Sequence, residues 1–240
     1  MTGQLRARFA ATAARVAESE ARRRADLTDR VRRFVQPRGD EYVLDAGAGT
    51  GALAFAVAPF VREVVAIDVV PALLAEGRKH AEQFPNVAFR EADLTQLPDD
   101  LGGFDLVGTL RTLHHIRRPE VAFAELTRVT RPGGRILVVD QVAPADPLLA
   151  LDLDRFERAR DLTHQRTLAD ADFRHFFEAN YLRLQRHEVV REMRELEPYL
   201  DLASCAGAER DQARALAPGR DTFAISVAWY LLLKPAAAGL

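Results

Sequence analysis

Between residues 42 and 140, short apolar runs alternate with stretches whose apolar positions recur at helical spacing. The runs have the length of buried strands and are predicted at Tyr42–Ala46, Glu63–Ile67, Val87–Glu91, Phe104–Leu110 and Ile136–Asp140. The helices between them are predicted at Ala52–Phe60, Pro71–Phe84 and Glu120–Thr130, the last ended by Arg131-Pro132-Gly133-Gly134. Strands that alternate with helices predict an α/β fold with a parallel sheet covered on both faces.

The segment before this core predicts one amphipathic cap helix over residues 4–35. Its outer face is rich in arginine, which could contact RNA or membrane phosphates. Acidic residues are interleaved with the arginines, and this mixture is more typical of a solvated surface. We therefore expect a single domain over 1–240 whose core, at 40–141, is covered by helical segments.

The segment after the core is mostly helical and adds two strands. The predicted helical insertions, which would cap the core and contact a substrate, cover 144–180 and 195–217. The first insertion contains a predicted helix at Ala169–Ala179, for which the hydroxyl of Thr167 is a candidate cap. The strands are predicted at Tyr181–Met193 and Phe223–Leu233, which brings the sheet to seven strands.

Composition narrows the class of protein. The chain has 240 residues, 48% of them hydrophobic and 28% charged, which is typical of a folded globular protein and excludes disorder. The net charge of −2 disfavours a nucleic-acid-binding role. Cys205 is the only cysteine, so an internal disulfide and cysteine-based zinc clusters are excluded, and no metal site is expected. The longest apolar run is too short for the ~20 residues of a membrane span, and no secretion signal is recognised, so a cytoplasmic protein is predicted.

A glycine-rich sequence, Val-Leu-Asp-Ala-Gly-Ala-Gly-Thr-Gly, occupies the turn from the first strand into the first core helix. Its glycines, at Gly47, Gly49 and Gly51, follow Asp45 with the spacing G-x-G-x-G. Residues without a Cβ atom let a ligand lie against the backbone. The dinucleotide fingerprint is G-x-G-x-x-G and binds a pyrophosphate, whereas this tighter spacing suits a ligand without phosphate. A tight turn with no ligand is the other interpretation.

Three further polar segments follow strands two, three and four. Asp68 ends the second strand, Asp93 follows the third, and Leu113-His114-His115-Ile116 follows the fourth. Because ligands of open α/β sheets bind outside the carboxyl ends of the strands, these segments are expected to converge on one crevice. Asp68 could accept both ribose hydroxyls of a nucleoside, and Asp93 could meet the adenine amino group. A helix cap is the alternative for either carboxylate taken alone.

With these motifs assembled, the sequence resembles the class I S-adenosylmethionine-dependent methyltransferases. The branch is that of the ubiquinone/menaquinone C-methyltransferases and many small-molecule methyltransferases. The resemblance is close over residues 40–141 and is carried by VLDAGAGTG, VVAIDVVPALL, LHHI and RVTRPGGRILVVD. It implies a Rossmann-like, seven-stranded, mostly parallel sheet with the last strand antiparallel. It also implies S-adenosylmethionine as cofactor and methyl transfer to a small organic acceptor by in-line displacement.

The resemblance also assigns cofactor contacts. The methionine part would lie on Asp45, Gly47, Gly49 and Gly51. The ribose would lie on Asp68, and the adenine on Val69, Asp93 and Leu94. The backbone at Leu110 and Arg111 would lie under the sulfonium, although the sequence Gly-Thr-Leu-Arg ending there departs from the family pattern and affects the acceptor side.

Catalysis of this reaction mainly requires alignment of donor and acceptor, which can contribute ~7–11 kcal/mol. A base helps if the acceptor is a phenol or an activated carbon, and histidine has a suitable pKa. The candidates are His114 and His115 beside the crevice and His164 in the insertion. The alternatives are a packing role for one of the adjacent pair, a wall role for the other, and a helix-end hydrogen bond for His164.

Other functions stay open at this point. One is a cofactor-binding or scaffold protein that transfers no methyl group, and another is a nicotinamide-dependent oxidoreductase, which would require the G-x-G-x-x-G turn that this chain lacks. A methyltransferase acting on nucleic acid or protein is a rival within the same family. The expected partner is a small-molecule acceptor, with no nucleic acid and no membrane span, and a homodimer is one arrangement that the sequence allows.

Overall fold

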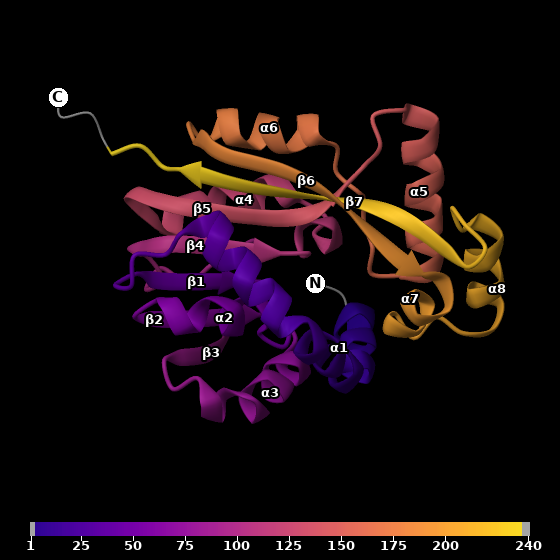
Figure 1. Ribbon diagram of the computed structural model, residues 1–240, viewed down its shortest axis with the longest axis horizontal. Helices are drawn as coiled ribbons and strands as arrows, with labels where there is room; N and C mark the ends of the chain where they lie inside the picture. Colours follow the sequence, from indigo (N-terminus) through magenta and orange to yellow (C-terminus); the bar gives the residue numbers. More distant parts are fainter. Residues whose placement is uncertain (1–2, 237–240) are drawn as a thin grey trace.

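The computed structural model describes residues 3–236. Its seven strands form one sheet in the order β3-β2-β1-β4-β5-β7-β6 (Figure 1). The strands are β1 (Tyr42–Ala46), β2 (Glu63–Asp68), β3 (Val87–Glu91), β4 (Phe104–Leu110), β5 (Thr130–Val142), β6 (Arg183–Glu195) and β7 (Thr222–Leu233). β1 to β5 are parallel, and β7 is antiparallel to both of its neighbours. The predicted mostly parallel sheet with an antiparallel last strand is confirmed.

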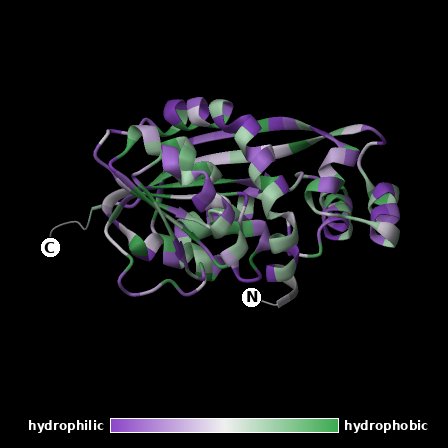
Figure 2. Ribbon diagram, turned by 90° about the horizontal axis from the view of Figure 1, so that it is seen from below, coloured by the Kyte–Doolittle hydropathy of each residue, from purple (hydrophilic) through white to green (hydrophobic). Residues whose placement is uncertain are grey.

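Helices cover both faces of this sheet. They are α1 (Gly3–Val35), α2 (Ala52–Val57), α3 (Pro71–Lys79), α4 (Pro119–Val129), α5 (Pro147–Arg160), α6 (Asp170–Ala179), α7 (Leu196–Leu202) and α8 (Gly207–Leu216). Successive strand residues point to opposite faces. Val43 therefore packs in the cluster formed with α1, α2 and α5, whereas the next residue, Leu44, packs in the cluster formed with α4 and α6. In Figure 2 the interior strands are mostly coloured as hydrophobic.

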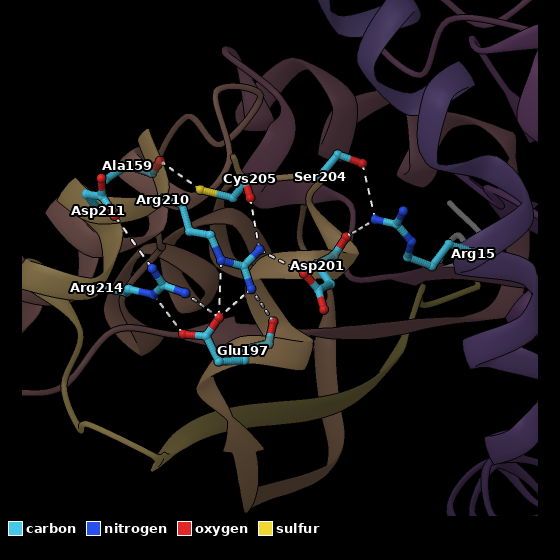
Figure 3. A network of polar contacts seen from close by, with 9 residues as sticks. All are labelled: Arg15, Ala159, Glu197, Asp201, Ser204, Cys205, Arg210, Asp211 and Arg214. Atoms are coloured by element: carbon cyan, nitrogen blue, oxygen red, sulfur yellow. Dashed lines mark hydrogen bonds and ion pairs between the residues drawn. The ribbon is translucent and has the colours of Figure 1, made fainter. Parts of the chain in front are cut away.

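Helix α1 links two parts of the molecule. Its C-terminal half packs beside α2, where Phe34 meets the ring of Trp229 edge-on at 5.4 Å between ring centroids. Its N-terminal half reaches α7, which lies with α8 beyond one end of the β6–β7 pair (Figure 1). There Arg15 donates to the backbone oxygen of Asp201 and to Ser204, at the edge of an arginine–carboxylate network (Figure 3). Arg210 extends that network to Asp201 at 2.7 Å.

Strand β5 is longer than predicted. The segment Arg131–Gly134, predicted to end a helix, belongs to the strand, and a register shift opposite Phe104 and Leu106 accommodates it. Its backbone finds partners far away in the chain, because Gly133 N–H donates to the Lys234 oxygen at 2.8 Å and Lys234 N–H donates to the Gly134 oxygen at 2.9 Å. Gly133 adopts φ 76°, which glycine tolerates. The proline and glycines do end helix α4, as predicted. They do not end regular structure, because pairing with Lys234 makes residues 131–134 part of β5.

One prediction in the C-terminal half is refined and another is wrong. The predicted helical segment 195–217 is interrupted, because α7 ends at Leu202 and Ser204 adopts φ 50° before α8 begins. Thr167 does not cap α6, since this side chain is buried and its hydroxyl lies 3.3 Å from Nε2 of His164. The first turn of α6 is instead closed by Asp172, whose carboxylate accepts from Ala169 N–H at 2.9 Å.

Candidate active site

A cavity of about 830 Å³ opens at the carboxyl ends of β1, β2 and β4. Of the predicted cofactor residues, all except Gly51 line it; they are Asp45, Gly47, Gly49, Asp68, Val69, Asp93, Leu94, Leu110 and Arg111. Helix α1 covers part of the opening with Phe9, Val16 and Glu20, and the insertion over 144–180 contributes Gln165. The insertion over 195–217 contributes no lining residue within the described part of the chain. The predicted convergence of the strand ends is therefore observed.

Asp45 is buried at the floor of the cavity. Its Oδ2 atom accepts from Ala54 N–H at 2.8 Å, in the first turn of α2, whereas its Oδ1 atom is buried without a partner. Burial raises the pKa of Asp45 to about 8, and the nearby carboxylates of Glu20 and Asp68 add to the effect. A buried polar atom without a partner is costly, so it marks a place where a donor belongs.

The three glycines of the loop have different surroundings. Gly49, at φ 57°, opens onto the cavity, since a Cβ atom there would meet nothing within 4 Å. Gly47 permits close approach of Thr112, whose methyl carbon would lie 2.2 Å from an added Cβ. Gly51 lies outside the lining, and a Cβ there would meet the rings of Phe55 and Phe89 at 2.9 and 3.0 Å. The third glycine therefore serves packing of the loop against the protein interior.

Asp68 and Asp93 each hold a local turn. Asp68 accepts from Gly49 N–H with Oδ2 and from Val70 N–H with Oδ1, both at 2.9 Å. Burial raises its pKa, against the effect of these amide hydrogen bonds. Asp93 accepts from the amide and hydroxyl of Thr95 at 2.8 and 2.7 Å. Each carboxylate oxygen has more than one acceptor site, so turn formation leaves capacity for a ligand.

His114 and His115 follow β4 on a short 3₁₀ helix, Leu113–His115, and differ in surroundings. His114 does not line the cavity; its Nδ1 lies 2.5 Å from Oδ1 of Asp140. Burial opposes its charged form, but the attraction and hydrogen bond of Asp140 outweigh burial and raise the pKa of His114.

His115 lines the cavity, with Nδ1 3.0 Å from Oγ1 of Thr163. Burial, followed by the charge of His114, lowers the pKa of His115 far below its ordinary value. The third candidate, His164, is buried away from the cavity, and its Nε2 lies 3.2 Å from Oδ1 of Asp154. Between residues 3 and 236, no three histidine, cysteine or acidic side chains are grouped as they would be to hold a metal ion.

Glu20, on α1, is a site residue that the sequence analysis missed. Its carboxylate contacts the hydroxyl of Thr50 beside the glycine loop and lines the cavity. Burial raises its pKa to about 7, although the Thr50 hydroxyl and nearby arginines oppose the shift. A signal was present, because Glu20 lies four residues after Val16 and thus interrupts the apolar stripe of the helix.

Comparison with known proteins finds similarity to methyltransferases. Residues 43–134 match the family described as a methyltransferase domain. Over 150 residues the chain is 32% identical to an uncharacterized methyltransferase, YcgJ, of Bacillus subtilis (strain 168), covering 62% of this chain and 59% of that protein. The crystal structure of YcgJ has the same fold, with a TM-score of 0.82 at 22% identity over 89% of this chain and 100% of that one. Over residues 43–134 the chain is therefore similar to methyltransferase domains, and its fold is that of YcgJ.

The chain also resembles a second named methyltransferase. It is 36% identical over 127 residues to a demethylmenaquinone methyltransferase of Clavibacter sepedonicus, covering 53% of this chain and 52% of that enzyme. The chain thus spans between half and three fifths of the length of these two curated relatives. None of the helices in the described residues combines the length and the apolar character needed to cross a membrane.

Proposed function

We propose that this protein is a class I S-adenosylmethionine-dependent methyltransferase that transfers a methyl group to a small organic acceptor. The observation that carries the proposal is one cavity, about 830 Å³ in volume, that extends from the glycine loop to His115. Sites for small molecules span ~300–1,000 Å³, and this volume near the upper end suits a donor with an acceptor beside it. Phe9 and Val16 of α1 cover the opening, which favours a small acceptor over a polymer.

The residues present fit the donor. The partnerless Oδ1 of Asp45 suits the ammonium group of the methionine part, and the open backbone at Gly49 suits its close approach. We assign the ribose to Asp68, and the adenine to Val69, Asp93 and Leu94. The backbone at Leu110 and Arg111 is assigned to the reacting end. Gly51 supports the loop from behind and does not belong to the contact set.

For this reaction the protein mainly has to align the acceptor with the methyl donor, because the sulfonium is already reactive. When bound, S-adenosylmethionine would supply an electrophilic sulfonium methyl group to an electron pair on an acceptor O, N, C or S atom, and sulfur would keep the electron pair of the broken S–CH₃ bond. The walls of the cavity align the acceptor and exclude water, and alignment can contribute ~7–11 kcal/mol. For an acidic acceptor such as a phenol, His115 is the candidate base, because it is the one of the three histidines that lines the cavity.

The test has a binding arm and a turnover arm. S-adenosylhomocysteine should raise the melting temperature of the purified protein, and NAD should not. Phenols, quinones, amines and polyketide-like compounds are then screened with S-adenosylmethionine, and S-adenosylhomocysteine formation is measured. Binding without turnover on any acceptor would favour the scaffold alternative. A shift with NAD alone would overturn the family assignment of the cofactor.

A further inference from the structure

The ring of His115 is held at one nitrogen by a side chain from a distant segment. Its Nδ1 lies 3.0 Å from Oγ1 of Thr163, on the segment between α5 and α6. The same hydroxyl donates to Oδ1 of Asp161 at 2.7 Å, and Thr163 N–H donates to that oxygen at 2.9 Å. Thr163 and Asp161 are only 4% and 7% exposed, so water competes little for these bonds.

The direction of these bonds determines the tautomer of His115. A hydroxyl has one hydrogen, and the hydroxyl of Thr163 gives it to the carboxylate of Asp161. Toward His115 the same oxygen must therefore accept, which requires a hydrogen on Nδ1 of the ring. In a neutral imidazole with Nδ1–H, the lone pair is on Nε2.

The Nε2 atom of His115 is available to a ligand. It forms no hydrogen bond within residues 3–236. It is also not sealed in the interior, unlike Nδ1 of His164, which is buried without a partner. His115 is also one of the residues that line the cavity of the proposed acceptor space. The ring of Phe9 meets His115 edge-on at 5.3 Å between centroids and limits its rotation.

The chain of hydrogen bonds continues into helix α1. Nε of Arg8 lies 3.3 Å from the same Oδ1 of Asp161, and Nη2 of Arg8 donates to the backbone oxygen of Arg160 at 2.8 Å. Arg8 and Asp161 are both largely buried. The helix that covers the cavity is thus docked on the segment that orients His115.

We propose that Thr163 and Asp161 are positioning residues that hold His115 as the Nδ1–H tautomer, with Nε2 aimed at the acceptor. This inference rests on the proposed methyl transfer. As the acceptor X–H bond breaks, its electron pair stays on X to form the bond to the methyl carbon, and the proton passes to Nε2. The imidazolium keeps its Nδ1–H bond to Thr163, with Asp161 behind it, and then releases the Nε2 proton to solvent. His114 is not available for this step, since it does not line the cavity and its Nδ1 is paired with Asp140.

The primary test reads the tautomer directly and needs no turnover. Nitrogen chemical shifts of ¹⁵N-histidine-labelled protein bound to S-adenosylhomocysteine are recorded at neutral pH, with His115 assigned through the signals lost in His115→Gln. We expect Nδ1 protonated and Nε2 unprotonated in the wild type. In Thr163→Val, which keeps the shape and removes the acceptor, the Nε2–H form should appear. Finding Nε2–H in the wild type would overturn the inference, even if methyl transfer is observed.

A kinetic arm separates positioning from a structural role. With an acceptor found in the screen, Thr163→Val should lower kcat by ~10²-fold, the lower end of general-base effects, and change the acceptor KM by less than about twofold. Thr163→Ser, which retains the hydroxyl, should restore most of the rate. Thr130→Val is the matched control, because Thr130 is equally buried, bonds only to the backbone, and starts β5 at the opposite end of the sheet.

The outcomes distinguish the two proposals. If the wild type neither binds S-adenosylhomocysteine nor transfers methyl groups, the proposed function fails, and the tautomer of the unliganded protein still decides the positioning role. If the enzyme turns over and Thr163→Val keeps the wild-type kcat and tautomer, the positioning role fails alone. If Thr163→Val does not fold, Asp161→Asn takes its place, and the wild-type tautomer still decides.

Discussion

His114 and His115 are neighbours in the chain with ring centroids 4.1 Å apart, yet their pKa values shift in opposite directions. Asp140, at the end of β5, pairs with His114 and favours its charged form. His115 has only a hydroxyl at Nδ1 and lies in the cavity wall, where burial favours the neutral form. Two titratable groups whose surroundings separate their pKa values in this way are typical of a site that assigns them different roles.

The His114–Asp140 pair should stabilise the protein over a limited pH range. The pKa of His114 is raised above 6.5, so its contribution is complete below that value and is lost as the pH rises through the folded-state pKa. The pKa of Asp140 is lowered below 3.8, so its contribution is complete above that value and is lost as the pH falls through the folded-state pKa. The pair therefore contributes most between pH 3.8 and 6.5.

Replacing one partner tests this pair. Asp140→Asn should lower the free energy of unfolding by ~3–5 kcal/mol at pH 6, because it leaves a buried group without its partner. Between pH 6 and 8 the difference from the wild type should shrink. Urea unfolding at pH 6, 7 and 8 measures both effects, with the exposed Asp99→Asn as control. A loss that is the same at all three pH values would contradict the pairing.

Asp68→Ala should weaken S-adenosylhomocysteine binding severely. Hydrogen bonds to a charged group contribute ~1.5–3 kcal/mol each, so the loss of one or two of them raises Kd by ~10-fold or more. Calorimetric titration gives Kd, and circular dichroism checks the fold, because Asp68 also accepts from Gly49 and Val70. Wild-type affinity in a folded variant would refute the ribose assignment. Asp40→Ala, an exposed carboxylate outside the cavity lining, is the control.

Binding of the donor should release protons. In the unliganded protein burial raises the pKa of Asp45 to about 8 and that of Glu20 to about 7, so both carboxyls are partly neutral at pH 7. An ammonium group placed beside them favours the ionised forms, and affinity should therefore increase from pH 6 to 8.5. Calorimetry in buffers of different ionisation enthalpy counts the protons. Asp45→Asn should reduce the release, and an affinity that is independent of pH would contradict this linkage.

The stability of the unliganded protein should change in the opposite sense. Groups with raised folded-state pKa values contribute stability that is complete below their ordinary pKa, 4.5 for Glu20 and 3.8 for Asp45, and that is lost as the pH rises from there to about 7 and about 8. The free energy of unfolding should thus decrease over that range, and less so in Asp45→Asn. Saturating S-adenosylhomocysteine should reduce the decrease, since bound ligand favours the ionised carboxylates.

Alanine at two glycines should separate binding from folding. Gly49→Ala places a Cβ atom in the cavity, so it should raise the Kd for S-adenosylhomocysteine strongly and cost only ~1–2 kcal/mol of stability for its positive φ. Gly51→Ala adds contacts with Phe55 and Phe89 to a positive φ, so it should cost more stability than Gly49→Ala and affect Kd less. Melting curves and titrations of both variants measure the contrast, and equal effects would contradict the division of roles.

The sequence alone determined the alternation of strands and helices and the place where the cavity forms. Asp45, Asp68 and Asp93 could be brought together in advance, because the carboxyl ends of parallel strands meet at one edge of the sheet regardless of packing detail. The glycine spacing indicated a ligand that lies against the backbone and has no phosphate. These predictions needed only local sequence patterns and the rule that ligands bind at the carboxyl ends of parallel strands.

Other features depended on partners far away in the sequence. The pairing of Gly133 with Lys234 turned a predicted stop signal into strand, and Glu20 reached the glycine loop only because α1 packs across it. Which of His114 and His115 faces the cavity was decided by Asp140 and Thr163, which hold the two rings from different segments. Side-chain direction within one short turn is set by such long-range contacts, and only the tertiary structure contains them.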